Sequence, residues 1–284
     1  MDIRILNNVE GDGSLVLEVE LDLKDLAQLK DEAQRALAIE RTLPESARTP
    51  FANASESAYL ADFVKMRATN DALEIRNIIP VAAPLEETAG YVEGEPYRCT
   101  LRVHPRPEIG LTSLEPVDLA TNRIVKPGFS AKAGREGGED VEFVDDERTL
   151  RMIMTKRLDS ELSDNQIRAL ADEYQAKFEK KLFESNIDPE TYQVAHGLNE
   201  EQYQLMMART ALADAHWNYV LDAVFVGNGF TVSRDDLVTT YELECPGFGE
   251  QLFELHDLRN DLYHVVEKYR RGKALMWLKD NAIR

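Results

Sequence analysis

Helix start signals recur from about Glu147 to the end of the chain, and strand-like alternation is absent from this half of the sequence. Each signal pairs a capping residue with a partner that is favoured in the first helical turn. These pairs are Ser163 with Gln166, Asp188 with Pro189, Asn199 with Gln202, and Ser233 with Asp236. The spacing predicts an all-α half whose longest helix has about 27 residues, or ~40 Å, and ends near Gly227.

A last helix is expected from near Glu250 to Asn281. Its apolar side chains recur at spacings of three and four, which places them on one helical face. They are Leu255, Leu258, Leu262, Val265 and Tyr269. Long helices with short connections favour an elongated body with helical arms.

The amino-terminal residues follow a different pattern. Residues 14–22 alternate apolar and polar side chains, which is typical of a strand with one buried face. Two helices are then predicted over residues 24–40 and 55–73, with Leu26, Leu29, Ala33 and Leu37 facing inward on the first and Tyr59, Phe63 and Met66 on the second.

Two more strands are predicted in this half. LEIRNIIPV, residues 73–81, is the weaker, because a proline fits only at a strand end or on a sheet edge. YRCTLRVHP, residues 97–105, is the stronger, and VEGEP before it fits a hairpin turn. The predicted fold class is therefore α+β: a small amino-terminal α/β sheet domain followed by an elongated all-α carboxy-terminal domain with helical arms. The predicted domains are residues 1–119, a glycine-rich flexible linker over residues 120–146, and residues 147–284.

The charge balance restricts the partners. The formal net charge is −19, which disfavours nucleic acid and anionic membrane surfaces because both require clustered Lys and Arg. No apolar run resembles a signal peptide or a spanning helix, and the two cysteines are too few for a disulfide scaffold or a four-ligand zinc site. We expect a cytoplasmic protein with neither nucleic acid nor membrane among its partners.

A search for catalytic chemistry yields no candidate. The sequence lacks a P-loop, a nucleophile elbow and a His-Glu-x-x-His pattern. His256 and His264 lie eight residues apart on one expected helix, which would separate them by two turns and prevent chelation. In NIDPETYQVAHGLNEEQY, residues 186–203, the clustered acids and His196 are better explained as helix caps and a helix end. We therefore expect no enzyme activity, no catalytic residue, no metal site and no cofactor.

Large apolar side chains on the predicted helices remain. Core packing is the commoner role of any one of them, but an extended helical body cannot bury every apolar stripe. Methionine adapts its shape to many sequences, so these residues are candidates for binding other polypeptides. The candidate client-binding residues are Met152, Met154, Phe178, Phe183, Met206, Met207, Trp217 and Met276.

The order of these elements resembles the bacterial trigger factor family. YRCTLRVHPRPEIGLTSLEPVDL, residues 97–119, is similar to the end of that family's amino-terminal domain, and residues 163–237 and RRGKALMWLKDNA, residues 270–282, follow its helical half. The resemblance is loose over residues 10–119 and closer over residues 160–282. It implies an ATP-independent chaperone or holdase that captures unfolded or nascent polypeptides on apolar helical surfaces.

Two departures from the family limit what carries over. The family docks on the ribosome through a G-F-R-x-G-K-x-P loop, whereas IERTLPESARTPF, residues 39–51, lacks the glycines and the basic pair. Residues 120–146 are too few for the prolyl isomerase domain of the FKBP type that the family carries at this place. We expect neither ribosome docking through this loop nor isomerase activity. The alternative function is a partner-specific interaction or assembly protein without general chaperone activity.

Overall fold

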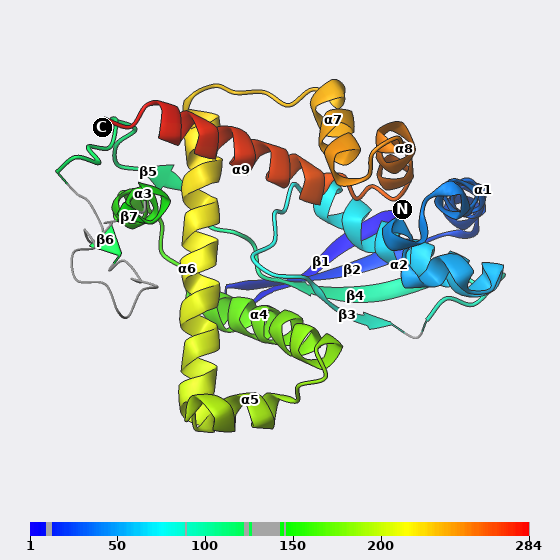
Figure 1. The fold of residues 1–284 in the computed structure, drawn as a ribbon. Helices are drawn as coiled ribbons and strands as arrows, with labels where there is room; N and C mark the ends of the chain where they lie inside the picture. The colour runs from blue at the N-terminus through cyan, green and yellow to red at the C-terminus, as the bar shows by residue number, and fades with distance from the viewer. Residues whose placement is uncertain (10–12, 89, 122–124, 127–142, 145, 284) are drawn as a thin grey trace. The chain divides into compact units, whose positions relative to one another are not determined.

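The structure is a computed structural model that describes residues 1–9, 13–88, 90–121, 125–126, 143–144 and 146–283. The chain divides into two compact units, each assembled from several segments (Figure 1). Unit 1 contains residues 1–107, 161–212 and 232–269, and unit 2 contains residues 108–160, 213–231 and 270–284. Each unit combines segments from both predicted halves of the chain. The predicted domain boundaries at residues 119 and 147 stay predictions.

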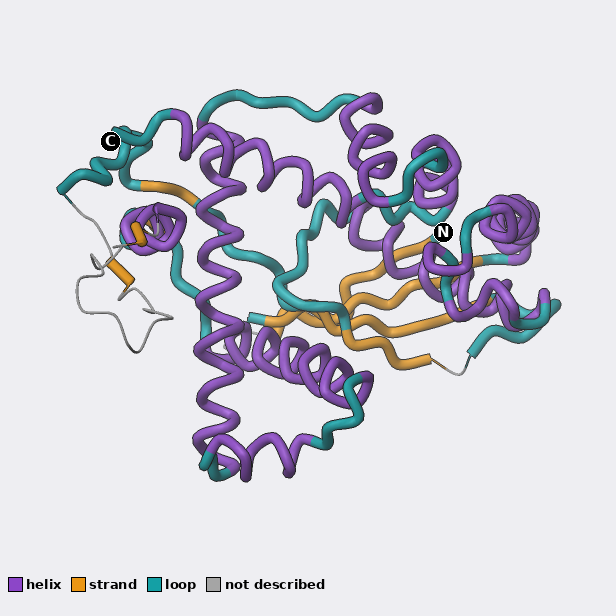
Figure 2. The backbone as a smooth tube through the Cα atoms, viewed as in Figure 1, coloured by secondary structure: helices purple, strands orange, loops and turns teal. Residues whose placement is uncertain are grey.

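A four-stranded antiparallel sheet organises unit 1. Its order is β1 (Asp2–Val9), β2 (Ser14–Leu21), β4 (Tyr97–Val103) and β3 (Leu85–Thr88), as Figure 2 shows. The predicted alternation in β2 and β4 is confirmed: Leu17 pairs with Leu101 in the central register, and both side chains are buried.

Helices α1 (Leu23–Thr42) and α2 (Glu56–Ile75) pack on β2 and complete this core. Asp22 caps α1 by accepting hydrogen bonds from the amides of Lys24 and Asp25. The inward positions predicted for both helices are confirmed, with Met66 partly buried and the others buried. The short 3-10 turns η1 (Glu45–Ala47) and η2 (Pro50–Asn53) lie between these helices.

The weaker predicted strand is wrong. Residues 73–75 finish α2, and Asn77 then adopts a positive φ of 51° that ends helical geometry. Pro80 forms an isolated bridge with Pro105, while the edge strand forms at Leu85–Thr88. Residues 73–75, which the apolar pattern assigns to a strand, therefore form the last turn of α2 instead.

Three helices of the carboxy-terminal half contribute to the buried core of unit 1, in whole or in part. They are α7 (Arg234–Glu244), α8 (Gly249–Leu258) and the first residues of α9 (Tyr263–Asp280). Leu237, Tyr241, Leu252, Leu255 and Val265 join the same buried core as the sheet and α1. The core of unit 1 is thus built from both ends of the sequence.

The single last helix predicted over residues 250–281 is also wrong, because the chain breaks between α8 and α9. Asn260 adopts the left-handed backbone conformation, with a φ of 48°. The Asp261 amide donates to the His256 carbonyl at 2.8 Å, and this hydrogen bond completes the end of α8. Asparagine tolerates this conformation better than most residues. The apolar spacing of three and four runs through the break and conceals it.

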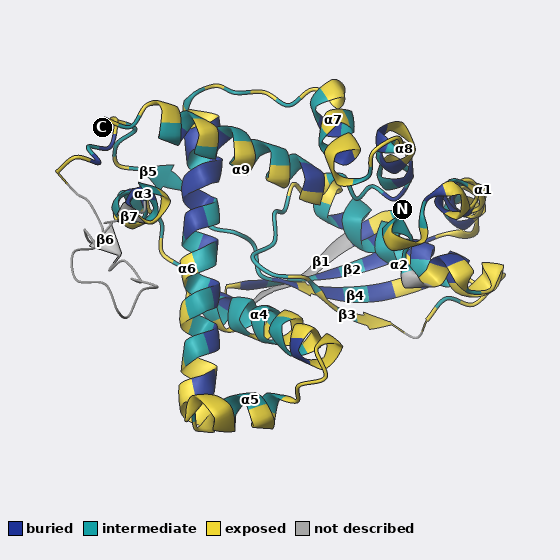
Figure 3. Ribbon diagram, in the orientation of Figure 1, coloured by how far each residue is buried: buried dark blue, intermediate teal, exposed yellow. Residues whose placement is uncertain are grey.

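Unit 2 contains α3 (Asp146–Thr155), the second part of α6 (Glu200–Gly227) and the last part of α9. Two small antiparallel pairs join β5 (Gly110–Leu111) to β8 (Leu158–Asp159), and β6 (Val125–Lys126) to β7 (Phe143–Val144). Its buried residues include Leu150, Met154, Val220, Val224 and Leu278, and Figure 3 colours buried residues dark blue. Most of the predicted linker over residues 120–146 lies outside the described residues.

Among the described residues, none of the helices combines the length and apolar character that crossing a bilayer requires.

Candidate functional site

A helical hairpin within unit 1 contains four of the eight candidate binding residues. We call it the arm and define it as α4 (Asp164–Glu184), α5 (Pro189–His196) and residues 200–212 of α6. At its base, the Gln166 side chain donates to the Pro105 carbonyl at 2.7 Å, and Glu173 accepts from the Ala83 amide at 2.7 Å. These two bonds attach α4 to the segments that flank β3 and β4.

The predicted caps form the turns of the arm. Ser163 and Gln166 form a reciprocal capping box at the start of α4, and Asp188 accepts from the Thr191 amide at 2.8 Å at the start of α5. Gly197 takes a positive φ of 65° and ends α5. Asn199 and Gln202 then exchange backbone-to-side-chain hydrogen bonds of 2.9 and 2.8 Å, and α6 begins. The interpretation of residues 186–203 as two helix junctions is confirmed.

An aromatic cluster holds the three helices of the arm together. Phe178 on α4 meets Tyr192 on α5 edge-on, with ring centroids 5.1 Å apart, and Tyr203 on α6 lies 6.4 Å from Tyr192. Burial together with the nearby Glu179 carboxylate raises the pKa of Tyr203 to about 12, so its hydroxyl stays neutral at pH 7. These aromatic contacts therefore pack α4, α5 and the start of α6 against one another.

Large apolar side chains remain exposed where the arm turns. The exposed fractions are 79% for Phe183, 38% for Ile187, 75% for Val194 and 46% for Leu205. They lie at the end of α4, in the following turn, on α5 and on the first part of α6 (Figure 1). We call these four residues the tip residues. Contiguous exposed apolar patches mark binding surfaces on soluble proteins, so this segment is the candidate surface of the arm.

The chain around the tip residues is acidic. Between Phe183 and Leu205 the sequence carries Glu184, Asp188, Glu190, Glu200 and Glu201, and no Lys or Arg. Hydrogen bonds from Thr191 lower the pKa of Asp188, so this carboxylate stays charged well below neutral pH. The surface at the turn of the arm thus combines apolar side chains with net negative charge.

The eight predicted binding residues divide between the two units. Phe178, Phe183, Met206 and Met207 lie on the arm, and the other four lie in unit 2. Phe183, Met152 and Met276 are exposed, Phe178 and Met206 are partly buried, and Met154, Met207 and Trp217 are buried. The three buried side chains serve packing, because they offer no surface to a second chain.

Sequence reasoning missed three of the tip residues: Ile187, Val194 and Leu205. Their signal was available but weak. Ile187 and Val194 lie in or beside a helix of eight residues, which is too short to bury a full apolar face, and Leu205 falls on the opposite side of α6 from Tyr203 and Met207.

Unit 1 also contains a pocket of about 470 Å³ between α1 and the start of α2. Leu37, Tyr59 and Leu60 form its apolar wall, and Lys30 at its rim makes an ion pair of 2.7 Å with Glu93.

Comparison with known proteins gives a family match over part of the chain. Residues 147–280, just under half of the chain, match the family described as the carboxy-terminus of bacterial trigger factor protein. One similar solved structure comes from work on "Promiscuous Substrate Recognition in Folding and Assembly Activities of the Trigger Factor Chaperone"; it is 14% identical, with a TM-score of 0.43 over 99% of each chain. No curated protein sequence matches this chain significantly. Residues 147–280 are therefore similar to the carboxy-terminal family of bacterial trigger factor.

Proposed function

We propose that this protein is an ATP-independent chaperone of the holdase type, which binds unfolded or nascent polypeptides reversibly through the tip residues of the arm. The observation that carries the proposal is the exposure of Phe183 and Val194, at 79% and 75%, on a segment that lies inside the matched family region. Phe183 lies in the last turn of α4 and Val194 on α5, and both helices begin at capping residues.

The available apolar surface sets the expected strength of binding. Full burial of one Phe or Val side chain contributes about 1.5–3 kcal/mol. Four partly or largely exposed tip residues would supply roughly 4–8 kcal/mol in total, from which the cost of ordering a flexible client is subtracted. Binding in the micromolar range or weaker is the consequence, and such a complex releases its client without ATP.

The charge around the tip residues favours a class of client segment. Five carboxylates lie between Phe183 and Leu205, a stretch without Lys or Arg, and they attract unfolded segments that carry basic residues beside apolar ones. Since these carboxylates are exposed, salt near 1 M would screen the attraction and leave the apolar part. The net charge of −19 would in turn keep the complex soluble.

The other exposed candidates form a second part of the proposal. Met152 on α3 and Met276 on α9 are 40% and 66% exposed, and both belong to unit 2. Phe178 and Met206 support the tip residues from partly buried positions on the arm. Met154, Met207 and Trp217 are left out because their side chains are buried.

The proposal also states that the chain acts without docking on the ribosome and without prolyl isomerase activity. In the loop that would dock on the ribosome, the Arg48 guanidinium donates to the carbonyls of Leu43 and Arg41 at 2.8 and 3.0 Å. Two of its N–H donors are therefore engaged at the end of α1. We place this chaperone activity in the cytoplasm, without prolyl isomerase activity and without nucleic acid or membrane partners.

Aggregation suppression tests the proposal. Several unrelated denatured clients would be diluted into buffer with near-stoichiometric amounts of the chain, and light scattering would be followed. The double variant Phe183→Ser/Val194→Ser should lose most of the protection. The matched control is Leu243→Ser/Ile75→Ser, which removes apolar residues that are 80% and 62% exposed on α7 and α2.

A partner-specific assembly protein is the second candidate function. It is favoured by the small number of tip residues, which would suffice to hold one folded partner. Protection of none of the unrelated clients by the wild-type chain would exclude the holdase and favour this alternative. Equal loss of protection in both double variants would assign the activity to general surface hydrophobicity and refute the assignment to the arm.

A further inference from the structure

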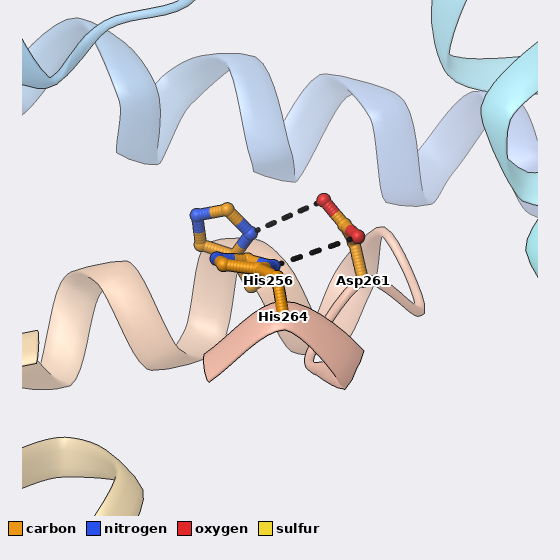
Figure 4. Close-up of side chains that lie close together, drawn as sticks. All are labelled: His256, Asp261 and His264. Atoms are coloured by element: carbon orange, nitrogen blue, oxygen red, sulfur yellow. Dashed lines mark ion pairs between the residues drawn. The ribbon is translucent and has the colours of Figure 1, made fainter. Parts of the chain in front are cut away.

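Three side chains that can bind a metal ion converge where α8 ends and α9 begins (Figure 4). His256 lies on α8, Asp261 in the connecting turn and His264 on α9. The His256 Nδ1 atom is 3.5 Å from one Asp261 carboxylate oxygen, and the His264 Nδ1 atom is 3.7 Å from the other. One ligand atom from each residue lies within 4.8 Å of the other two.

The break between the helices creates this arrangement. On one continuous helix the two histidines would lie two turns apart, near 12 Å at 1.5 Å per residue. The turn instead brings their ring centroids to 4.7 Å. Asn260 fixes the turn, because its side chain amide donates to Asp71 at 2.8 Å and to Glu74 at 2.7 Å, both on α2.

The surroundings leave ligand atoms available. The His256 Nδ1 atom is shielded from solvent and makes no hydrogen bond within the described part of the chain, although it faces Asp261. The Tyr241 ring stacks on His256 with centroids 5.2 Å apart and meets His264 edge-on at 6.2 Å, which limits how far the imidazoles can turn away. A buried imidazole nitrogen without a hydrogen bond is costly unless another group engages it.

We propose that His256, Asp261 and His264 form a binding site for a transition-metal ion of the Zn²⁺ or Co²⁺ class. Two imidazoles and one carboxylate suit these ions, whereas Ca²⁺ and Mg²⁺ prefer sets of oxygen ligands. Bonds of 2.0–2.2 Å in a tetrahedral site place the ligand atoms roughly 3.3 Å apart. Contraction of the cluster by up to about 1.5 Å is therefore needed, and His264, whose side chain is 48% exposed, can provide it by rotating.

The remaining coordination positions would be filled by water. Glu244 on α7 is a further carboxylate that acts electrostatically on His264, and it already forms an ion pair with Lys268. The bound ion would join α8 to α9 across their turn. This inference does not depend on the chaperone proposal, and it replaces the expectation from sequence that these histidines cannot share an ion.

Equilibrium dialysis of the untagged full chain against Co²⁺ alone tests the site, with visible absorption as the readout of imidazole coordination. The wild-type chain should bind one equivalent with a visible band, while Mg²⁺ and Ca²⁺ at the same concentration should not compete. His264→Gln and Asp261→Asn should each weaken Co²⁺ binding at least tenfold. The matched control His196→Gln removes an exposed histidine outside the cluster and should bind as the wild type does.

A thermal melt provides the second measurement. Co²⁺ at about 100 times its dissociation constant should raise the melting temperature of the wild type by roughly 5–10 °C and leave His264→Gln unmoved. Because His264 is half exposed, this variant should keep the far-UV circular dichroism of the wild type. Absence of Co²⁺ binding by the wild type, or equal binding by His264→Gln and His196→Gln, would overturn the proposal and leave the cluster as an ion-paired network.

Discussion

A buried charge cluster joins the carboxy-terminal helices to the amino-terminal ones inside unit 1, and its removal should be costly. The Arg259 guanidinium, at the end of α8, donates to the Glu40 carboxylate on α1 at 2.6 Å and to the Tyr59 hydroxyl on α2 at 2.7 Å. The side chains of Arg259 and Glu40 are 6% and 0% exposed. Glu40 also accepts a hydrogen bond from the Thr49 amide, so its carboxylate is fully engaged.

Arg259→Met should destabilise unit 1 by about 3–5 kcal/mol, because the Glu40 charge would stay buried without its partner. Glu40→Gln should cost a similar amount by leaving the guanidinium buried. The new amide keeps an oxygen for the Thr49 amide, so the double variant contains no unpaired buried charge at that position. We therefore expect the double variant to cost at least about 2 kcal/mol less than the sum of the singles.

Urea unfolding followed by far-UV circular dichroism would give the free energies, and amide hydrogen exchange would locate the loss of protection in α1, α2 and α8. Both tryptophans, Trp217 and Trp277, lie in unit 2, so tryptophan fluorescence reports separately on that unit. A cost below about 1 kcal/mol for Arg259→Met, or strict additivity in the double variant, would refute the reasoning.

Two further predictions concern packing and pH. Gly249→Ala should lower the free energy of unfolding in urea by roughly 1–3 kcal/mol, because a Cβ there would lie 2.7 Å from the Val238 carbonyl oxygen. The control Gly272→Ala adds a Cβ that meets nothing within 4 Å and should be neutral or stabilising. Equal effects of the two changes would contradict the packing argument. Burial lowers the pKa of His216, so the folded state prefers the neutral imidazole. The stability this residue contributes is present above about pH 6.5 and is lost as the pH falls below that value towards the lowered folded pKa. His216→Gln should therefore reduce the loss of urea midpoint between pH 7.5 and pH 5. An unchanged pH dependence of the urea midpoint in this variant would contradict the assignment.

Local signals in the sequence predicted the starts of the carboxy-terminal helices. Ser163, Asp188, Asn199 and Ser233 cap helices where expected, because a cap is made by side chains within three residues of the amides they bind. The break at Asn260 was not predictable in this way. It depends on Asp71 and Glu74, which lie far away in the sequence and bind the Asn260 side chain.

The surface residues were harder to predict than the helices. Met206 and Met207 are adjacent in the sequence, yet Met207 is 1% exposed and Met206 is partly buried. Which of two neighbouring apolar residues faces solvent depends on the helix packed beside it, and periodicity alone does not specify that helix. Phe183 was identified because it is large and apolar, whereas Val194 was missed because α5 has no extended apolar face.

Site-specific photocrosslinking tests the chaperone account most directly. A photoreactive phenylalanine analogue would replace Phe183 on the arm or Leu243 on α7, which are 79% and 80% exposed. Each labelled chain would be irradiated with several unrelated unfolded clients and with their folded forms. The account predicts strong crosslinks from position 183 to the unfolded clients and weak ones from position 243. Crosslinks of equal strength from both positions, or none to any unfolded client, would contradict it.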